Sequence, residues 1–470
     1  MLVLGQANNV GIGTTTPDES AVLDLVSTSQ GLLPPRMTAL QRKSIVNAKA
    51  GLIVWCSDCG ESGELQVYNG FVWTNIVGDA GKSGPFTSTQ LGLDIDGATA
   101  GDLCGGAVAL SADGTILAVG AEGYDGISGS TTDIGHVRVF EWIINAWVQI
   151  GADIVGEGNG DLSGGYGLSI SADGMRVAIG APQNTNIGIY SGHVRVYDWD
   201  GTAWVQAGQD LDGYAQFYKS GTSLALSADG NTVIIGASEH FTINKGHVRV
   251  YTWNGYSWTQ LGIHFFGSNN NDDLGHSVSI SSDGSRIAMT QSIRTSGSVI
   301  LFEWNGSAWV QLDLIIGAQN GEKFGSSVSL SADGNRIAIG ASEYDGSFTD
   351  VGCVRVYDWN GSYFAQVGTD IEGEAIGDKS GDKVALSADG THLVVSAQHN
   401  TGTGVEAGHA RLYTWNGTSW LQVGTDMDGE AIYDRSGASV AISANGARVA
   451  IGAKHNEGNG PDAGHVRVYE

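Results

Sequence analysis

The chain of 470 residues contains 72 Gly, 13 Trp and 15 Tyr, which gives it material for a large core and excludes a disordered glycine-rich chain. Its formal net charge of −27 argues against nucleic acid and anionic membrane surfaces as partners, because it offers no basic surface to neutralise phosphates. No run approaches the roughly 18 consecutive apolar residues of a spanning helix, so we expect no membrane insertion.

Residues 1–85 do not repeat, and we expect them to form a small β-rich module. Thr38 is predicted to cap a short helix that ends near residue 46. Residues 52–55 and 65–68 are predicted strands, and Asn69-Gly70 is a hairpin turn. The module has too few apolar residues for a core of its own. We therefore expect it to be ordered against another copy, another protein or the rest of the chain, with symmetric self-association favoured.

Several motifs of this module resemble a short module found in secreted Bacteroidota proteins and phage-type tail fibres. They are residues 9–14, Pro17 and Leu23-Asp24. Residues 31–36, and Tyr68-Asn69-Gly70 with Trp73, fit the Bacteroidota version. The resemblance implies an extracellular or cell-surface location, attachment rather than catalysis, and trimeric assembly. The alternative is a β-rich cap with no function of its own.

Residues 81–85 read as a linker, and a repeat begins after it. Its centre is Ser331-Ala332-Asp333-Gly334, a tight turn between two alternating apolar stretches. This strand–turn–strand motif recurs seven times at steps of 50 to 60 residues. Its first serine is at Ser111, Ser171, Ser227, Ser281, Ser331, Ser387 and Ser443. Such a period is typical of stacked or radially arranged units.

One repeat, residues 324–368, shows four strands: 327–331, 336–340, 353–359 and about 364–367. Glycine-rich turns and alternating strands place the chain in the all-β class. Four antiparallel strands per unit predict a seven-bladed β-propeller of four-stranded blades over residues 86–470, preceded by the module of residues 1–85.

The strand count predicts how the propeller closes. Strands one to three occur seven times, but only six copies of strand four follow them. Residues 86–97 are unpaired and match residues 420–429, which include a fourth strand. We expect this N-terminal piece to supply the outer strand of the last blade, so that the ring closes by strand exchange.

The repeats resemble the FG-GAP propeller family of integrin α-subunits. Phe324-Gly325 matches the first half of that name, and residues 179–182 match the second. Calcium-binding members carry several aspartates in the turn between strands one and two. Here the turn carries one carboxylate, and Asn445 replaces it in the last repeat. One carboxylate cannot supply the six to eight oxygens that calcium prefers, so no calcium is expected there.

Two sets of repeated side chains suggest chemistry. The histidines at the start of strand three are expected to be hydrogen-bonded structural groups between blades rather than metal ligands, because neighbouring sheets lie ~10 Å apart. They are His136, His193, His247, His409 and His465. The tryptophans around Asn-Gly turns are predicted to pack between blades, with sugar binding as the alternative.

A second acidic repeat precedes strand one, as in Asp426…Asp428. Its carboxylates are expected to be solvated. The alternative is a bound calcium, shared with Asp102, Asp378 or Asp434; otherwise no cofactor is expected. Cys56 and Cys59 are predicted to form a local disulfide or free thiols rather than a metal site, and Cys104 and Cys353 to be inert.

The loops after strands two and four vary in length, and by alternation they share one face of the propeller. We expect this face to contact a protein or a glycan; drift of unconstrained loops is the alternative. The predicted contact residues are Tyr124, Asp125, Tyr190, His240, Tyr344, Asp345 and Tyr433.

No nucleophile elbow, zinc-protease motif or phosphate loop occurs in the sequence. The sequence therefore predicts a secreted, non-enzymatic recognition or attachment protein whose propeller is the contact head and whose N-terminal module docks it to a fibre, filament or surface. The alternatives are a glycan-binding lectin and a propeller glycosidase or lyase.

Overall fold

The computed structural model divides the chain into two compact units, Met1–Gly78 and Asp79–Glu470. In the first unit it describes residues 2–4, 10–12, 23–25, 34–38, 41–42, 44–45, 49, 52–57, 64–68 and 73–75. In the second it describes residues 86–126, 133–238, 245–269, 272–291 and 296–470. The predicted linker at 81–85 and the turn Asn69-Gly70 lie outside these residues.

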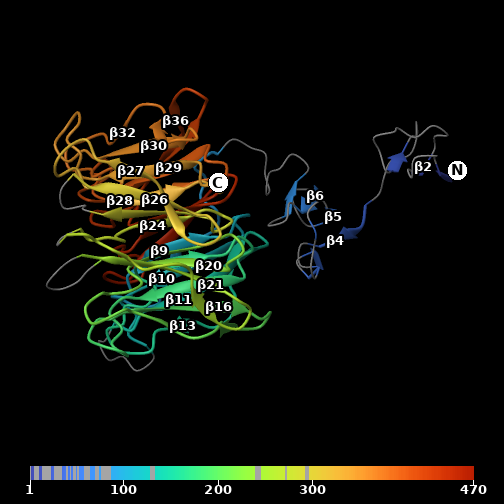
Figure 1. Ribbon diagram of the computed structural model, residues 1–470, viewed down its shortest axis with the longest axis horizontal. Helices are drawn as coiled ribbons and strands as arrows, with labels where there is room; N and C mark the ends of the chain where they lie inside the picture. The colour runs from blue at the N-terminus through green and yellow to red at the C-terminus, as the bar shows by residue number, and fades with distance from the viewer. Residues whose placement is uncertain are drawn as a thin grey trace. The chain divides into compact units, whose positions relative to one another are not determined.

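The first unit contains two small sheets (Figure 1). One consists of β1 (Leu2–Leu4), β2 (Val10–Ile12) and β3 (Leu23–Leu25). The other consists of β4 (Arg36–Met37), β5 (Ile53–Cys56), β6 (Glu64–Tyr68) and β7 (Trp73–Asn75). The predicted strands at 52–55 and 65–68 are thus present: β5 is shifted by one residue at both ends, and β6 begins one residue earlier.

Thr38 caps a helical turn, as predicted. Its hydroxyl accepts a hydrogen bond from the backbone N–H of Gln41 at 3.2 Å, and the Gln41 side chain accepts one from the N–H of Thr38 at 3.0 Å. This reciprocal pair is a capping box, which satisfies two N–H groups that the first turn leaves free. Gln41 and Arg42 are helical, and buried Arg42 donates to the side chain of Gln66. The helix is shorter than predicted, because Ser44 is in a turn and Ile45 is not helical.

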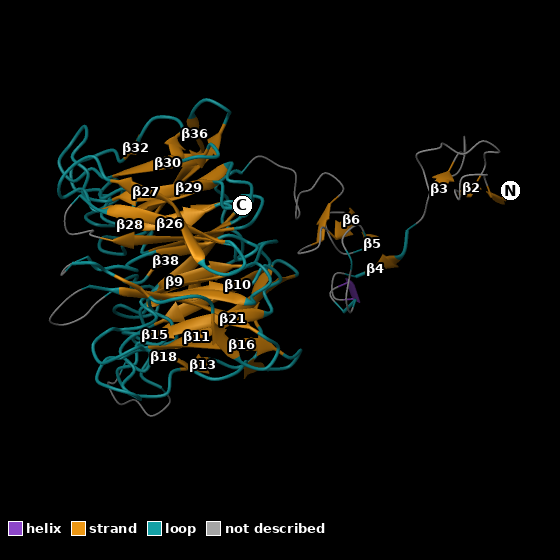
Figure 2. Ribbon diagram, viewed as in Figure 1, coloured by secondary structure: helices purple, strands orange, loops and turns teal. Residues whose placement is uncertain are grey.

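The second unit is an all-β propeller whose described residues form seven antiparallel sheets, called blades one to seven in chain order (Figures 1 and 2). The first strands are β9 (Cys104–Leu110), β14 (Leu168–Ile170), β19 (Ser223–Leu226), β24 (Val278–Ile280), β28 (Phe324–Leu330), β33 (Val384–Leu386) and β37 (Ser439–Ile442). The second strands are β10 (Ile116–Ala121), β15 (Arg176–Ala181), β20 (Thr232–Ala237), β25 (Arg286–Gln291), β29 (Arg336–Ala341), β34 (His392–Ala397) and β38 (Val449–Ala453).

The third strands are β11 (His136–Ile143), β16 (His193–Trp199), β21 (His247–Trp253), β26 (Ser298–Trp304), β30 (Cys353–Trp359), β35 (His409–Trp415) and β39 (His465–Tyr469). The outer strands are β12 (Ala146–Gln149), β17 (Trp204–Gln206), β22 (Trp258–Gln260), β27 (Trp309–Ile316), β31 (Phe364–Gln366), β36 (Trp420–Asp428) and, in blade seven, β8 (Ile95–Asp96). Four blades add a short second outer piece: β13 (Ile154–Val155), β18 (Leu211–Asp212), β23 (Phe265–Phe266) and β32 (Ile371–Glu372).

The repeated turn is fixed by its own side chains. The Ser331 hydroxyl donates to Oδ1 of Asp333 at 2.7 Å, and the N–H of Asn335 donates to the same oxygen at 2.9 Å. Gly334 has a φ of 65°, which a residue without a side chain adopts at low cost. The sequence Ser-Ala-Asp-Gly therefore ends strand one and starts strand two at Arg336 in a single conformation.

Neighbouring blades approach closely and are joined by tryptophan. A Cβ added to Gly340 would lie 1.9 Å from the carbonyl oxygen of Gly381 in the next blade, so only glycine allows this separation without a shift. The indole of Trp258 donates to the carbonyl of Ala207 in the preceding blade at 2.9 Å. Trp204 and Trp309 donate to the preceding blade in the same way. The predicted role of these tryptophans between blades is confirmed.

The ring closes by strand exchange, as predicted. In β8, Ile95 and Asp96 pair antiparallel with Val466 and His465 of β39, and the N–H of Leu91 donates to the carbonyl of Val468 at 2.7 Å. On the other side of blade seven, β38 lies beside β9 of blade one (Figure 2). Seven inter-blade hydrogen bonds of 2.8 to 2.9 Å follow the ring at the repeated turns, through Ala112, Ala172, Ala228, Ser282, Ala332, Ala388 and Ala444.

Candidate functional site

A cavity of about 320 Å³ lies among the first strands of all seven blades. Its lining includes Gly106, Tyr166, Thr222, His276, Ser327, Asp382 and Ser439. These residues lie just before strand one or in its first half, on the face that also carries the variable loops. The cavity therefore opens on the predicted contact face.

Most polar groups around this cavity form hydrogen bonds or ion pairs with other residues of the protein. Gln398 donates to the carboxylate of Asp382, and Lys454 lies 3.1 Å from Glu122. The hydroxyls of Ser223 and Ser439 each donate at 2.7 Å to a glycine carbonyl of the following blade. The cavity thus presents paired charges and small side chains to a ligand.

The side chains of four predicted contact residues interact with neighbouring residues of their own blade. Tyr124 stacks on His136 with ring centroids 4.0 Å apart, and burial raises the pKa of its hydroxyl. The Arg355 guanidinium lies 5.0 Å from the centre of the Tyr344 ring. Asp125 accepts a hydrogen bond from the backbone N–H of Asp133 at 3.2 Å, and Asp345 accepts one from that of Asp350 at 2.9 Å. Each bond closes the loop that carries the aspartate.

Tyr190 and Tyr433 are exposed, as a contact role requires. Both have positive φ angles, of 51° and 65°, and Tyr190 meets Phe217 edge-on at 6.3 Å. His240 lies outside the described residues. The predicted residues belong to different blades, so the structure distributes them around the ring instead of gathering them into one site.

A repeated polar cluster lies between the start of strand three and the outer strand. In blade six it contains His409, Asp426 from the same blade, and Glu374 from the preceding connector. Arg411 contacts both carboxylates, Asp426 at 2.9 Å and Glu374 more closely. The expectation of solvated carboxylates was wrong here, because the outer strand folds back onto β35 and carries Asp426 against a histidine and an arginine.

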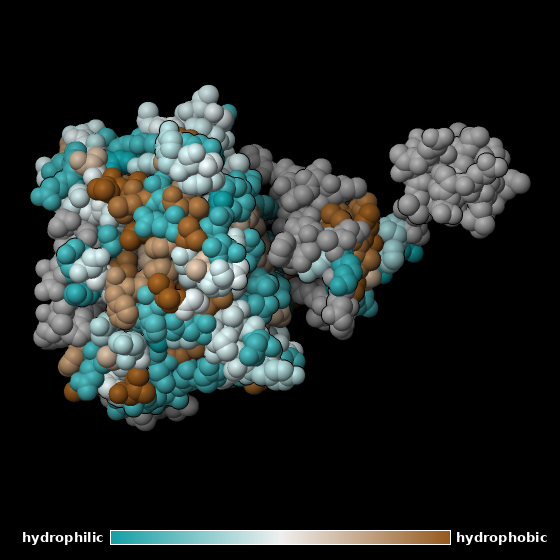
Figure 3. Space-filling model, in the orientation of Figure 1, coloured by the Kyte–Doolittle hydropathy of each residue, from teal (hydrophilic) through white to brown (hydrophobic). Residues whose placement is uncertain are grey.

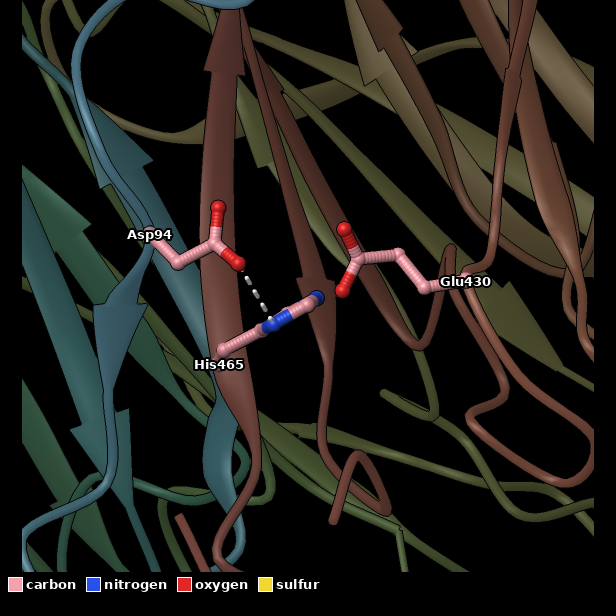
Figure 4. Close-up of side chains that lie close together, drawn as sticks. All are labelled: Asp94, Glu430 and His465. Carbon is pink, nitrogen blue, oxygen red and sulfur yellow. Dashed lines mark ion pairs between the residues drawn. The ribbon is translucent and has the colours of Figure 1, made fainter. Parts of the chain in front are cut away.

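The same cluster recurs in blade seven, where residues far apart in sequence meet (Figure 4). His465 of β39 points between the carboxylates of Asp94, just before β8, and Glu430 in the connector from blade six. Its Nδ1 lies 3.4 Å from Oδ2 of Asp94. The five histidines are buried, but the expected hydrogen bonds are absent for His465, neither of whose ring nitrogens hydrogen-bonds to a described residue.

Blade three replaces this polar cluster with aromatic rings. His264 and Phe266 stand where other repeats carry acidic residues, and Tyr214 replaces the connector glutamate. The ring of Tyr214 lies 5.4 Å from those of His247 and His264 and 5.6 Å from that of Phe266. Tyr218 meets Tyr214 edge-on at 6.0 Å. We call these five side chains the aromatic cluster.

The aromatic cluster is open to solvent and uncharged. Tyr214 is 54% exposed and Phe266 is 45% exposed. Burial, with Arg249 nearby, lowers the pKa of His247 to about 3, so its ring is neutral at physiological pH. Exposed aromatic rings beside neutral ring nitrogens suit contact with a protein or a sugar. Sequence reasoning missed this cluster, although the departure of His264-Phe265-Phe266 from the repeat was the signal.

The cysteines have no part in a described metal cluster. Cys56 is disulfide-bonded, while Cys59 lies outside the described residues. Cys104 and Cys353 are free and buried. Burial raises the pKa of the Cys104 thiol to about 11 and raises that of Cys353 as well, which agrees with the prediction that both are inert.

Residues 11–91 match a family described as the phage tail like trimerisation region. No curated protein matches the chain. The structure is similar to the β-propeller domain of Cps50 (Swd1) from Myceliophteria thermophila, with a TM-score of 0.50 and 11% identity over 77% of this chain and 96% of that one. It is also similar to a candidate 6-phosphogluconolactonase from Bacteroides uniformis, with a TM-score of 0.51 and 14% identity over 73% and 90% of the two chains.

At these identities the solved structures show the fold alone: the chain contains a β-propeller. The similarity of residues 11–91 fits the predicted self-association of the N-terminal module. Among the described residues, no helix is long and apolar enough to cross a membrane.

Proposed function

We propose that this protein is an extracellular or cell-surface recognition and attachment protein without catalytic activity. The propeller is the contact head, and residues 1–85 trimerise and dock it to a fibre, filament or surface. The observation that carries this proposal is the similarity of residues 11–91 to a phage tail like trimerisation region, a match that ends at the start of the propeller. Three weakly binding heads on one trimer gain avidity without any new contact.

The contact surface is the variable-loop face, and the aromatic cluster is the part of it that contributes most to binding. Tyrosine and other aromatic side chains contribute large contact areas at low entropic cost, and they are enriched at the centre of binding surfaces. On the side of the propeller visible in Figure 3, apolar residues form small groups separated by polar ones. A compact aromatic cluster therefore supports local, specific contacts.

We also assign the repeats to the FG-GAP type. Phe324 is fully buried and meets Tyr357 edge-on at 6.3 Å, and Gly325 has a φ of 96°. These two residues thus occupy positions that need a large apolar ring followed by glycine. The arrangement supports the sequence resemblance to FG-GAP propellers in blade five.

A glycan ligand is the second candidate, favoured by the flat, exposed rings of Tyr214 and Phe266. A propeller glycosidase or lyase is less well supported, because such an enzyme needs carboxylates free to act as acid and base. Among the cavity-lining residues, Asp382 accepts a hydrogen bond from Gln398, and Lys454 pairs with Glu122.

The test compares the Tyr214→Ala/Phe266→Ala double variant with Tyr256→Ala. Tyr256 lies in the same blade, in the hairpin after strand three on the opposite face, and is 89% exposed. Binding of the full-length protein to a glycan array and to intact bacterial cells should be lost in the double variant and retained in Tyr256→Ala. Turnover of a polysaccharide that disappears in Asp382→Asn would instead identify an enzyme.

A further inference from the structure

The cluster of Asp94, Glu430 and His465 in blade seven has the composition of a metal site. One ligand atom from each residue lies within 4.8 Å of the other two. Figure 4 shows the His465 ring between the two carboxylates, which approach it from opposite sides. Two carboxylates and a neutral imidazole together carry the charge that balances a divalent cation.

The state of His465 points to a missing ligand. Its side chain is 1% exposed, and neither ring nitrogen hydrogen-bonds to any described residue. Its Nδ1 lies 3.4 Å from the Asp94 carboxylate but does not hydrogen-bond to it, and Nε2 has no hydrogen-bond partner among the described residues. A buried polar atom without a hydrogen bond costs free energy, so native proteins rarely keep one.

The equivalent clusters of blades two and six differ because an arginine already occupies the cation position. Arg195 contacts both Glu157 and Asp210, and Arg411 contacts both Glu374 and Asp426.

In blade seven, Arg467 reaches Glu430 at 3.3 Å and donates to the carbonyl of Asp428. Among the described residues it forms an ion pair with Glu430 only. Asp94 contacts His465 instead, at 3.4 Å. The carboxylate of Asp94 and the imidazole thus face each other without an intervening guanidinium.

We propose that Asp94, Glu430 and His465 bind one divalent ion of the zinc class. Imidazole nitrogen with carboxylate oxygens suits zinc, whereas calcium and magnesium prefer sites made of oxygen alone. With bonds of about 2.0–2.2 Å, the ligand atoms of a tetrahedral zinc lie roughly 3.3 Å apart, so the three side chains must draw together by about an ångström. Glu430 can make this movement because its side chain is half exposed.

The metal would join three distant parts of the chain. Asp94 belongs to the closing strand, His465 to the last strand, and Glu430 to the connector between blades six and seven. Zinc bound here would therefore hold the N-terminal strand in the closed ring, and it would stabilise the folded chain because the unfolded chain has no preformed site.

The experiment uses the full-length chain without an affinity tag. The protein is stripped with a chelator, dialysed against dilute zinc chloride, and its zinc content is measured by mass spectrometry. We expect one zinc per chain and a rise in melting temperature. His465→Gln should weaken zinc binding by at least about tenfold, since even residues that only support a ligand cost that much.

His193→Gln in blade two is the matched control and should keep the zinc. Glu430→Gln provides a second test at a half-exposed position, in case the core substitution fails to fold. Cobalt should give visible absorption bands in the wild type that His465→Gln abolishes. Zinc content unchanged in both His465→Gln and Glu430→Gln, no zinc in the wild type, or three zinc ions per chain would overturn the proposal.

Discussion

The backbone N–H of Ala444 donates a hydrogen bond of 2.8 Å to the carbonyl oxygen of Ala112, which joins the last repeated turn to the first. Six equivalent bonds link the other turns in chain order, so this one completes a closed circle. The same two blades are joined again at the cavity by Lys454 and Glu122. Closure therefore does not depend on the exchanged strand alone.

The exchanged strand should nevertheless contribute much of the stability of the ring. Ile95 is buried in a cluster with Val466 and Val468, whereas Leu93 in the same segment is 87% exposed. Ile95→Ala should lower the free energy of unfolding by about 2–5 kcal/mol, because it leaves a cavity in the core. Leu93→Ala should change it by less than about 0.5 kcal/mol. Denaturant titration measures both, and equal effects would contradict the observed register.

The two free thiols should be silent in the folded protein. Cys104 is fully buried, and its pKa of about 11 leaves little thiolate at mildly alkaline pH. Cys353 is also fully buried and has a raised pKa. A colorimetric thiol reagent should titrate neither before denaturation and both after it. Rapid reaction of the native protein would show that these blades open locally.

Acid should weaken blade one through Asp153. The adjacent His136 ring, 3.3 Å away, holds the pKa of Asp153 at about 2, below its ordinary value of 3.8. The ionised carboxylate therefore stabilises the fold above that ordinary value, and this contribution is lost as the pH falls from about 4 towards 2.

The effect should be roughly 1 kcal/mol after allowance for screening, because the side chain is one-third exposed. Asp153→Asn should flatten the acid limb of a stability profile. Glu457→Gln, at an exposed carboxylate, should leave that limb unchanged; an identical loss in both variants would rule out the His136 contact as the cause.

Excess calcium should not raise the melting temperature. In the repeated turn, Asp333 already accepts hydrogen bonds from Ser331 and Asn335. In the connector, Asp434 accepts bonds from the N–H groups of Glu430 and Ala431 and from the amide of Asn456. These carboxylate oxygens would have to give up their hydrogen bonds before calcium could bind. A melting temperature that rises with calcium concentration would contradict this prediction.

The fold could be predicted because local sequence patterns that recur in every repeat determine its strands and turns. Alternation, the Ser-Ala-Asp-Gly turn and the missing seventh copy of strand four predict the sheets and the closing strand. The two-part outer edge, as in β31 and β32, was not predicted. Its second piece is only two residues long and is held by pairing with β30 rather than by any propensity of its own.

The candidate sites were harder to predict because they depend on contacts between repeats. The cluster of Asp94, Glu430 and His465 brings together residues separated by most of the chain. The aromatic cluster depends on Tyr214 of one connector meeting Phe266 of the next blade. The loop tyrosines were easy to recognise in the sequence, but the structure shows Tyr124 and Tyr344 supporting their own loops.

The mass of the native particle tests the central claim most directly. The chain has a mass of 48.9 kDa, so a trimer has a mass of roughly 147 kDa (3 × 48.9). Light scattering on the full-length protein should give the trimer mass, and a chain of residues 86–470 should give a monomer. A full-length particle of 48.9 kDa in dilute solution would contradict the account of a trimeric attachment protein.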